Sequence, residues 1–337
     1  MKILIVDGHA YAYRAFYAIR SLSSPEGRPT NAIYGFIKML GKMRATVNPS
    51  HLIVVWDGGL SAERREALPG YKAQRPEMPA DLAVQLDKII GYLGAANIAS
   101  YCAEGVEADD YIAFVTDAAA KAGMEVVIAS ADKDFMQLVS GDGERRAVEG
   151  RESRVESQAG SSALDPRTST LDSVGRVGLL NPNDKSETIW TAEQVRGKTG
   201  VEPGQIGDWL SLLGDSVDNI PGVPGVGPKT ATDLLKQFGS VTELYRRLDE
   251  VKSERIRGAL KLAEADVRRN QSLVRLKTEV GSEFSADALV ARPADAERLM
   301  GMYRGWGFRS MLAELESQGK SRVAEPKQDE GGQQELI

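Results

Sequence analysis

Three apolar runs restrict the fold of this chain more than any other feature. They read KILIV (2–6), HLIVVW (51–56) and EVVIAS (125–130), and none of them alternates with polar residues. Continuous apolar runs of this length are typical of strands buried on both faces of a parallel sheet. NIASYC (97–102) and VGLLN (177–181) are weaker strand candidates.

Helical patterns separate these runs. Two groups of apolar residues are spaced so that each group shares one face of a helix. One group is Ile33, Phe36, Ile37, Leu40 and Met43, and the other is Leu82, Leu86, Ile89, Ile90 and Leu93. Strands that alternate with helices predict an α/β domain with a mostly parallel sheet flanked by helices. From about residue 190 the pattern is helical, apart from the stretch NIPGVPGVGPKT (219–230).

The patterns predict an α/β domain over residues 1–189, an all-helical domain over 190–312 and a flexible tail over 313–337. Residues 146–175 are rich in Ser, Arg and Glu and poor in residues that could enter a core, so they are predicted to be a disordered insert. The single cysteine, Cys102, excludes an internal disulfide framework and fits a reducing compartment. No signal peptide or membrane span is recognisable, so a cytoplasmic protein is expected.

Acidic residues follow each strong strand. Asp7, Asp57, and the pair Asp132 and Asp134 come after the first, second and third runs. In open parallel sheets, ligands bind outside the carboxyl ends of the strands. Two further groups of acids are Glu107, Asp109 and Asp110 in GVEADD, and Asp215 and Asp218 in GDSVDN.

Each acid taken alone has a structural explanation, because carboxylates favour helix N-termini and turns. Taken together, acids that converge on one sheet edge repel one another unless cations neutralise them. With two histidines and one cysteine, a zinc site rich in nitrogen or sulfur is improbable, whereas carboxylates select Mg²⁺ or Mn²⁺. Nine acids exceed the needs of one ion and suit two, as in phosphodiester hydrolysis. The net charge of −6 does not exclude a polyanionic partner. If nine acids are gathered in one metal site, the rest of the chain carries −6 + 9 = +3.

Six blocks together resemble the bacterial 5′-nuclease family, the 5′→3′ exonuclease and flap endonuclease module of DNA polymerase I and its stand-alone homologues. They are VDGHAYAYRAFYA, NAIYGF, WDGGLSAERREALPGYKAQRPEMP, GVEADD, ASADKDFMQLV and LLGDSVDNIPGVPGVGPKTA, and they occur in family order. The resemblance implies a PIN-like α/β nuclease domain followed by a helix–three-turn–helix element that holds duplex DNA. All nine acids match metal-site positions of the family, the first five towards one ion and the last four towards the other; Asp7 and Asp57 are also counted as catalytic.

The resemblance gives further residues a role. Tyr71, Lys72 and Arg75 in GYKAQRP match the arch over the family's active site, where cations would stabilise charge on the scissile phosphate. By sequence alone, Lys72 and Arg75 would be two solvated surface charges. Arg14 is a candidate phosphate contact, although a packed or surface arginine is about as well supported. Asn31 is expected to cap its own helix.

The glycine-rich stretch is the predicted duplex-binding turn. At Gly222, Gly225 and Gly227 the backbone can approach a phosphate closely, and Lys229 and Thr230 lie at the start of the next helix. The alternative is an ordinary turn between packed helices. The family resemblance also implies a K⁺ ion at this element.

The last five residues, QQELI, loosely resemble a sliding-clamp docking peptide, with Gln333, Leu336 and Ile337 as anchors; a disordered terminus is the alternative. The predicted function is a metal-dependent 5′-nuclease acting, as a nucleoid-associated monomer, on DNA with 5′ ends or flaps, RNA-containing flaps included. The alternatives are a PIN-type ribonuclease and a non-catalytic, structure-specific DNA-binding module. Whether the chain stands alone or is a truncated polymerase is left open.

Overall fold

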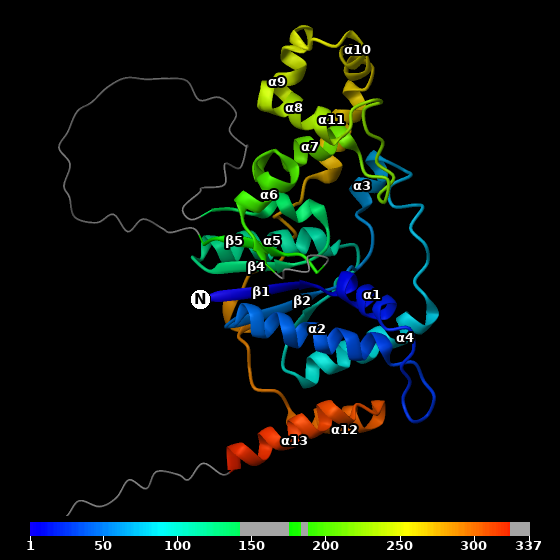
Figure 1. Cartoon of the computed structure of the whole chain (residues 1–337), viewed down its shortest axis with the longest axis vertical. Coiled ribbons are helices and arrows are strands. Elements are labelled where there is room, and N and C mark those ends of the chain that lie inside the picture. The colour runs from blue at the N-terminus through cyan, green and yellow to red at the C-terminus, as the bar shows by residue number, and fades with distance from the viewer. Residues whose placement is uncertain (142–174, 183–187, 324–337) are drawn as a thin grey trace, which may run out of the picture. The chain divides into compact units, whose positions relative to one another are not determined.

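The computed structural model describes residues 1–141, 175–182 and 188–323, and their side chains as far as residue 317 (Figure 1). The predicted insert, apart from its last residue, and the predicted clamp peptide lie outside the described residues. The chain divides into two compact units. The first comprises Met1–Tyr11, Leu40–Met78 and Ala99–Ala291, and the second comprises Ala12–Met39, Pro79–Ile98 and the chain from Arg292 onward. The predicted division at residues 189 and 190 stays a prediction.

A six-stranded sheet forms the centre of the first unit. Its strands are β1 (Lys2–Asp7), β2 (His51–Val55), β3 (Ala99–Tyr101), β4 (Glu125–Ala129), β5 (Val177–Leu180) and β6 (Ile189–Trp190). The order across the sheet is β3-β2-β1-β4-β5-β6, and all neighbours are parallel except β5 and β6. The three strong apolar runs are adjacent: Leu4 of β1 lies opposite Leu52 of β2 and Val127 of β4. Their side chains are buried, as continuous apolar runs predict.

Helices complete the first unit. They are α3 (Ala62–Ala67), α5 (Ala108–Lys121), α6 (Ala192–Thr199), α7 (Ile206–Leu213), α8 (Pro228–Phe238), α9 (Val241–Arg246), α10 (Glu254–Leu262) and α11 (Glu264–Val274), with 3₁₀ turns η1 (Lys133–Leu138), η2 (Pro203–Gln205), η3 (Leu248–Glu250) and η4 (Ala286–Leu289). α5 packs against β4 and β1, while α7 packs against α8, α11 and η1 (Figure 1). Because η1 directly follows β4, this packing brings the end of α7 towards the carboxyl edge of the sheet.

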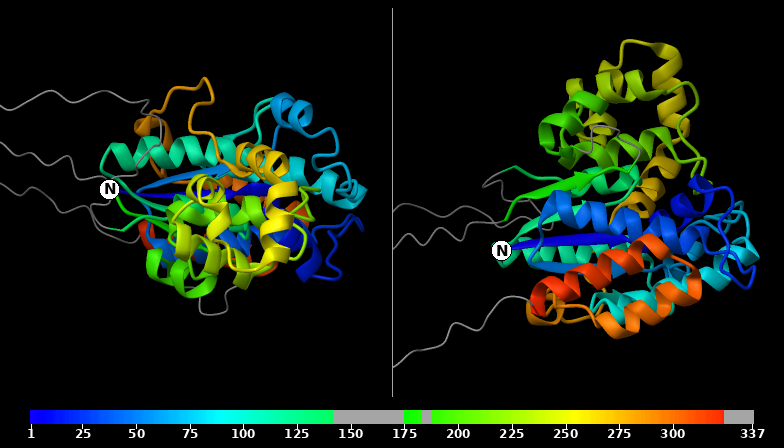
Figure 2. Two further views of the ribbon diagram at one scale, coloured as in Figure 1. Left: turned by 90° about the horizontal axis from the view of Figure 1, so that it is seen from above. Right: turned by 60° about the horizontal axis from the view of Figure 1, so that its bottom comes forward.

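The second unit is helical. It contains α4 (Ala80–Ala95), α12 (Ala296–Trp306) and α13 (Arg309–Val323), while α1 (Gly8–Ala18) and α2 (Asn31–Val47) each belong in part to both units. α12 packs against α4 and α13 (orange to red in Figure 2). None of the helices among the described residues is long and apolar enough to cross a membrane.

One member of a predicted helix face and one predicted cap are wrong. In α4, Ile90 is exposed while Gln85 is buried. Gln85 Oε1 accepts from the backbone of Ala32 (2.8 Å), and Gln85 Nε2 donates to Asn31 Oδ1 (3.0 Å). Asn31 does not cap its own helix, because its side-chain amide donates to the carbonyls of Phe16 (2.9 Å) and Ile19 (3.0 Å). Both residues satisfy backbone groups that would otherwise be buried without partners.

Candidate active site

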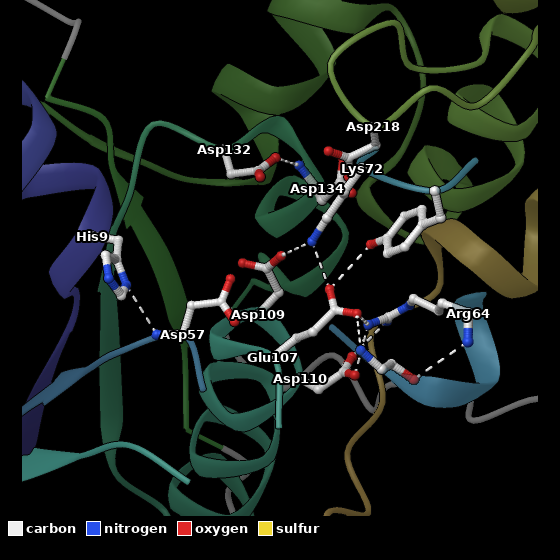
Figure 3. A network of polar contacts seen from close by, with 12 residues as sticks. His9, Asp57, Arg64, Lys72, Glu107, Asp109, Asp110, Asp132, Asp134 and Asp218 are labelled. Carbon is white, nitrogen blue, oxygen red and sulfur yellow. Dashed lines mark hydrogen bonds and ion pairs between the residues drawn. The ribbon is translucent and has the colours of Figure 1, made fainter. Parts of the chain in front are cut away.

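Acids gather at the carboxyl edge of the sheet because β1 lies between β2 and β4. Asp7 ends β1, Asp57 comes two residues after β2, and Asp132 comes three residues after β4. Ser130 connects two of these strand ends: its hydroxyl donates to Asp7 Oδ2 (2.8 Å) and accepts from the backbone N–H of Asp132 (3.1 Å). Asp57 is held by its backbone N–H, which donates to His9 Nδ1 (3.0 Å; Figure 3).

Glu107 lies at the N-terminus of α5 but does not cap that helix with its side chain. Its Oε2 accepts from Lys72 Nζ (2.6 Å) and from Tyr71 Oη (3.1 Å), and its Oε1 accepts from the backbone N–H of Ser61 (2.9 Å). Lys72 Nζ also lies 3.7 Å from Asp109 Oδ2. The carboxylates of GVEADD therefore face basic and hydroxyl side chains rather than the helix terminus.

Arg64, which the sequence did not single out, holds the remaining acid of this group. The guanidinium of this buried residue forms a bidentate pair with Asp110, with Nη1 to Oδ2 at 2.8 Å and Nη2 to Oδ1 at 2.7 Å. Its Nη1 also lies 3.2 Å from Glu107 Oε1.

The acids of the helical part meet basic groups as well. Arg75 Nη2 bonds to Asp218 Oδ1 (2.7 Å), and Lys133 Nζ lies 3.1 Å from Asp215 Oδ2. The backbone N–H of Lys72 donates to the carbonyl of Asp218 (3.0 Å), and Lys72 itself has a left-handed backbone with φ +55°. Such strain in a residue other than glycine persists only where the surroundings enforce it, and it concentrates at functional sites.

The electrostatics of the cluster are those of crowded like charges. Burial first, and then the charges of Asp132 and Asp57, raises the pKa of Asp7 to about 6. Burial and neighbouring carboxylates also raise the pKa values of Asp109, Asp132 and Asp134 above the ordinary range. Glu107 goes the other way: burial would raise its pKa, but Lys72 and Arg64 outweigh that effect and lower it. Two cations within 3.2 Å stabilise the charged form of Glu107, whereas burial and like charges disfavour the charged form of Asp109 even though Lys72 lies 3.7 Å away.

The donor set fits hard divalent cations. In the described residues, no three His, Cys, Asp or Glu side chains lie closely enough together to hold an ion. Several of the carboxylates instead pair with Lys72, Arg64, Arg75 or Lys133. The available donors are nevertheless carboxylate oxygens, and Asp134 Oδ1 is buried without a hydrogen-bond partner. An ion at this site would require Lys72 or Lys133 to move away from its acids.

The predicted duplex-binding turn connects α7 and α8. Val223 and Val226 are buried and anchor it, while Gly225, Gly227 and Lys229 are exposed. A Cβ atom on Gly222 would lie 2.0 Å from the Leu213 carbonyl oxygen, and Gly225 has φ +80°, so both positions require glycine. Nothing lies within 4 Å of a Cβ on Gly227.

The remaining predicted residues are placed as follows. Thr230 is half-buried in the first turn of α8, and Lys229 lies 3.6 Å from Asp233. Arg14 is exposed on α1, in the part of that helix that belongs to the second unit. Tyr71 is buried against Glu107 rather than exposed to a nucleic acid. The roles assigned to all these residues stay predictions.

Sequence reasoning missed four residues at the site: His9, Arg64, Ser130 and Lys133. Lys133 carried a signal, since it lies between Asp132 and Asp134 in the chain. Ser130 directly follows a strand, as the acids do. Arg64 had none, because an exposed arginine, Arg65, stands beside it on the same short helix.

The fold brings two features of the site together in one compact unit. An acidic sheet edge suited to hard cations lies on the same compact unit as a turn whose backbone can approach a phosphate. Comparison with known proteins identifies the family. The chain matches the family described as 5′-3′ exonuclease, N-terminal resolvase-like domain, over residues 2–160, and 5′-3′ exonuclease, C-terminal SAM fold, over residues 201–297.

Two curated relatives and one solved structure illustrate the match. The chain is 34% identical over 317 residues to a 5′-3′ exonuclease of Aquifex aeolicus, covering 94% of this chain and 96% of that protein. It is 37% identical over 325 residues to DNA polymerase I of Pseudomonas aeruginosa, covering 94% of this chain but 32% of that much longer protein. A complex of the bacteriophage T5 flap endonuclease with DNA and metal ions is similar in fold, with a TM-score of 0.61 at 19% identity, covering 94% of this chain and 99% of that one.

The chain belongs to the 5′-3′ exonuclease family. The predicted family and fold class are thereby confirmed. The chain spans about a third of the length of the DNA polymerase I relatives that it matches.

Proposed function

We propose that this chain is a divalent-metal-dependent 5′→3′ exonuclease and 5′-flap endonuclease that hydrolyses phosphodiester bonds of DNA in replication and repair. The observation that carries the proposal is that acids following β1, β2 and β4, at the start of α5 and in the turn after α7 lie near enough to raise one another's pKa values, with Lys72 and Arg75 paired to two of them. Bound cations would neutralise the crowded carboxylates at this edge. Hydrolysis of a phosphodiester requires cations that stabilise the charge on the phosphate and activate the attacking water.

Two Mg²⁺ or Mn²⁺ ions are the proposed cofactors. Asp7, Asp57, Glu107 and Asp109 would serve one ion, and Asp132, Asp134, Asp215 and Asp218 the other. Asp110 is paired with Arg64. When bound, such ions would lower the pKa of the attacking water and neutralise charge on the phosphodiester. Lys72 and Arg75, once released from Glu107 and Asp218, would place positive charge beside the scissile phosphate.

The turn between α7 and α8 is the proposed contact to duplex DNA. Gly225 and Gly227 are exposed on it, and α8 offers its positive end with Lys229 exposed beside it. A K⁺ ion is the cofactor proposed at this turn, where it would supply positive charge for a phosphate. Contacts of this kind detect the shape of the backbone rather than base sequence. The proposed substrates are DNA 5′ ends and flaps, RNA-containing flaps included. We further propose that the chain is a monomer in the cytoplasm, associated with the nucleoid. Its last five residues are proposed to bind a sliding clamp.

The test is cleavage of a 5′-labelled flap duplex by the full chain. With Mg²⁺, cutting near the flap junction is expected; with EDTA, or after Asp132→Asn, cutting should disappear while flap binding remains. Asp117→Asn is the matched control, because Asp117 lies on α5 and pairs with Lys121 away from the site. Tight flap binding without any cutting by the wild-type chain would instead support a non-catalytic DNA-binding module.

A further inference from the structure

Asp110 differs from the other acids in how its oxygens are used. Its Oδ1 accepts from Arg64 Nη2 (2.7 Å) and from the backbone N–H of Lys277 (2.9 Å), and its Oδ2 accepts from Arg64 Nη1 (2.8 Å). The residue is 5% exposed. Its neighbour Asp109, by contrast, meets only one basic group among the ion pairs of the site, Lys72 at 3.7 Å. Both oxygens of Asp110 are therefore occupied by short, charge-assisted or backbone hydrogen bonds.

Arg64 is satisfied to the same degree. Its Nε donates to the carbonyl of Leu273 (3.1 Å), and its Nη2 donates to the carbonyl of Arg275 (3.1 Å) as well as to Asp110. Its Nη1 lies beside both Asp110 and Glu107 Oε1. A guanidinium has five N–H donors, and here five acceptors surround it at hydrogen-bond distance. A lysine could not make these contacts, because they require a planar fork.

The carbonyls that Arg64 binds belong to the segment 273–277, which leads out of α11. Gln137 of η1 holds the same segment from another side, donating to the carbonyl of Val274 (3.1 Å) and accepting from the backbone N–H of Leu276 (3.3 Å). α11 packs against α7, whose C-terminal end leads to Asp215 and Asp218. The segment thus contacts Arg64 and η1 at the sheet edge, and the helix that precedes it packs against α7, which leads to the acids of the helical part.

We propose that Arg64 is a positioning residue for the cleavage site and that Asp110 is its anchor rather than a ligand of an ion. This inference rests on the proposed function. An ion that took Asp110 as a ligand would have to break a buried bidentate pair and leave Arg64 without its counter-charge, which is strongly unfavourable. Arg64, fixed by Asp110 and the 273–277 segment, in turn orients Glu107. The other oxygen of Glu107 accepts from Lys72 and Tyr71, and an ion would take the place of Lys72 there.

The experiment measures Mn²⁺ affinity by electron paramagnetic resonance and the steady-state constants of flap cleavage. It uses the full-length wild-type chain and the variants Asp109→Asn, Asp110→Asn, Arg64→Gln and the double variant Arg64→Gln/Asp110→Asn. Arg65→Gln is the matched control, because Arg65 is the exposed neighbour of Arg64 on α3. Thermal melting in EDTA establishes that each variant is folded at the assay temperature.

Asp109→Asn should weaken Mn²⁺ binding about tenfold or more. Asp110→Asn removes the counter-charge of Arg64 but no ligand of the ion, so it should change Mn²⁺ binding less than about threefold while lowering kcat as Arg64→Gln does. Arg64→Gln should lower kcat by about 10–100-fold with little change in KM for the flap, and the double variant should be no worse than Arg64→Gln alone. A residue that only stabilised the fold would lower the melting temperature without this selective loss of kcat.

Two results would overturn the proposal: an Asp110→Asn variant that binds Mn²⁺ as weakly as Asp109→Asn, or an Arg64→Gln variant with the kcat of wild type. If a variant does not fold, a crystal of the wild-type chain soaked with MnCl₂ decides. An Asp110 oxygen at ligand distance from an anomalous peak contradicts the proposal, and an intact Asp110–Arg64 pair beside the peak supports it. A wild-type chain that neither binds Mn²⁺ nor cleaves would refute the proposed function instead.

Discussion

At the scale of single residues, Lys72 has the most unusual surroundings. Its side chain is 1% exposed, its backbone is left-handed, and its ammonium is the counter-charge of Glu107 and Asp109. Burial opposes the charged ammonium, but Asp109 and Glu107 outweigh burial and raise its pKa. Removing one partner of a buried ion pair leaves an uncompensated charge, which typically costs about 3–5 kcal/mol.

We therefore expect Lys72→Met to lower the free energy of unfolding in EDTA by about 3–5 kcal/mol, measured by urea denaturation. MgCl₂ should then stabilise this variant more than wild type, because no ammonium has to leave the acids first. Lys121→Met is the control: this lysine is 67% exposed, and its loss should cost less than about 0.5 kcal/mol. A Lys72→Met variant as stable as wild type in EDTA would show that Lys72 is not the counter-charge of the cluster.

The residues that sequence reasoning found and missed differ in one physical respect. Seven of the acids were predictable because each follows a strand or lies at the start of a helix, so its local sequence places it at the sheet edge; Asp215 and Asp218, in the turn after α7, were found through the family resemblance. Arg64 and Gln85 were not, because their roles depend on acceptors and donors far along the chain. Arg64 binds a carbonyl 209 residues away, and Gln85 binds a backbone N–H 53 residues away. A buried polar side chain of this kind is recognised only when its distant partner is known.

At the scale of elements, the turn between α7 and α8 shows which glycines its shape requires. A methyl group on Gly222 would collide with the Leu213 carbonyl at 2.0 Å, so Gly222→Ala should displace the turn and lower the free energy of unfolding by about 1–3 kcal/mol. Gly227→Ala, with no atom within 4 Å, should change it by less than about 0.5 kcal/mol. Urea denaturation measures both. Equal destabilisation by the two substitutions would contradict the close approach at Gly222.

Displacing this turn by Gly222→Ala should also weaken DNA binding. Fluorescence anisotropy of a labelled flap duplex in EDTA should show a lower affinity for Gly222→Ala than for wild type.

The elements themselves were largely predictable, since the apolar runs of β1, β2 and β4 need no partner to be recognised. The two-residue strand β6 was not predicted, because so short a strand has no periodicity and exists only by pairing with β5.

At the scale of the whole molecule, the clustered acids make the stability of the metal-free protein depend on pH. An acid whose pKa is higher in the folded state binds its proton more tightly there, so its contribution to stability is complete at low pH and is lost as the pH rises through the folded pKa. Asp7 titrates near pH 6, and Asp109, Asp132 and Asp134 are shifted in the same direction. Glu107 acts in the opposite sense, but its lowered pKa confines that effect to acidic pH below its ordinary range.

In EDTA, the free energy of unfolding should therefore fall between pH 5 and pH 8, by about 1.4 kcal/mol from Asp7 alone. Its pKa rises from 3.8 to about 6, which corresponds to about 3 kcal/mol in total, and roughly half of this is already lost below pH 5. His9, whose pKa burial lowers, opposes this trend around neutral pH, but it is one group against several. MgCl₂ neutralises the ionised cluster and should raise the melting temperature more at pH 8 than at pH 5.5. Asp7→Asn is the internal comparison and should flatten the fall in EDTA. Stability that stays level or rises from pH 5 to pH 8 in EDTA would mean that the acids are not crowded in solution as they are in the structure.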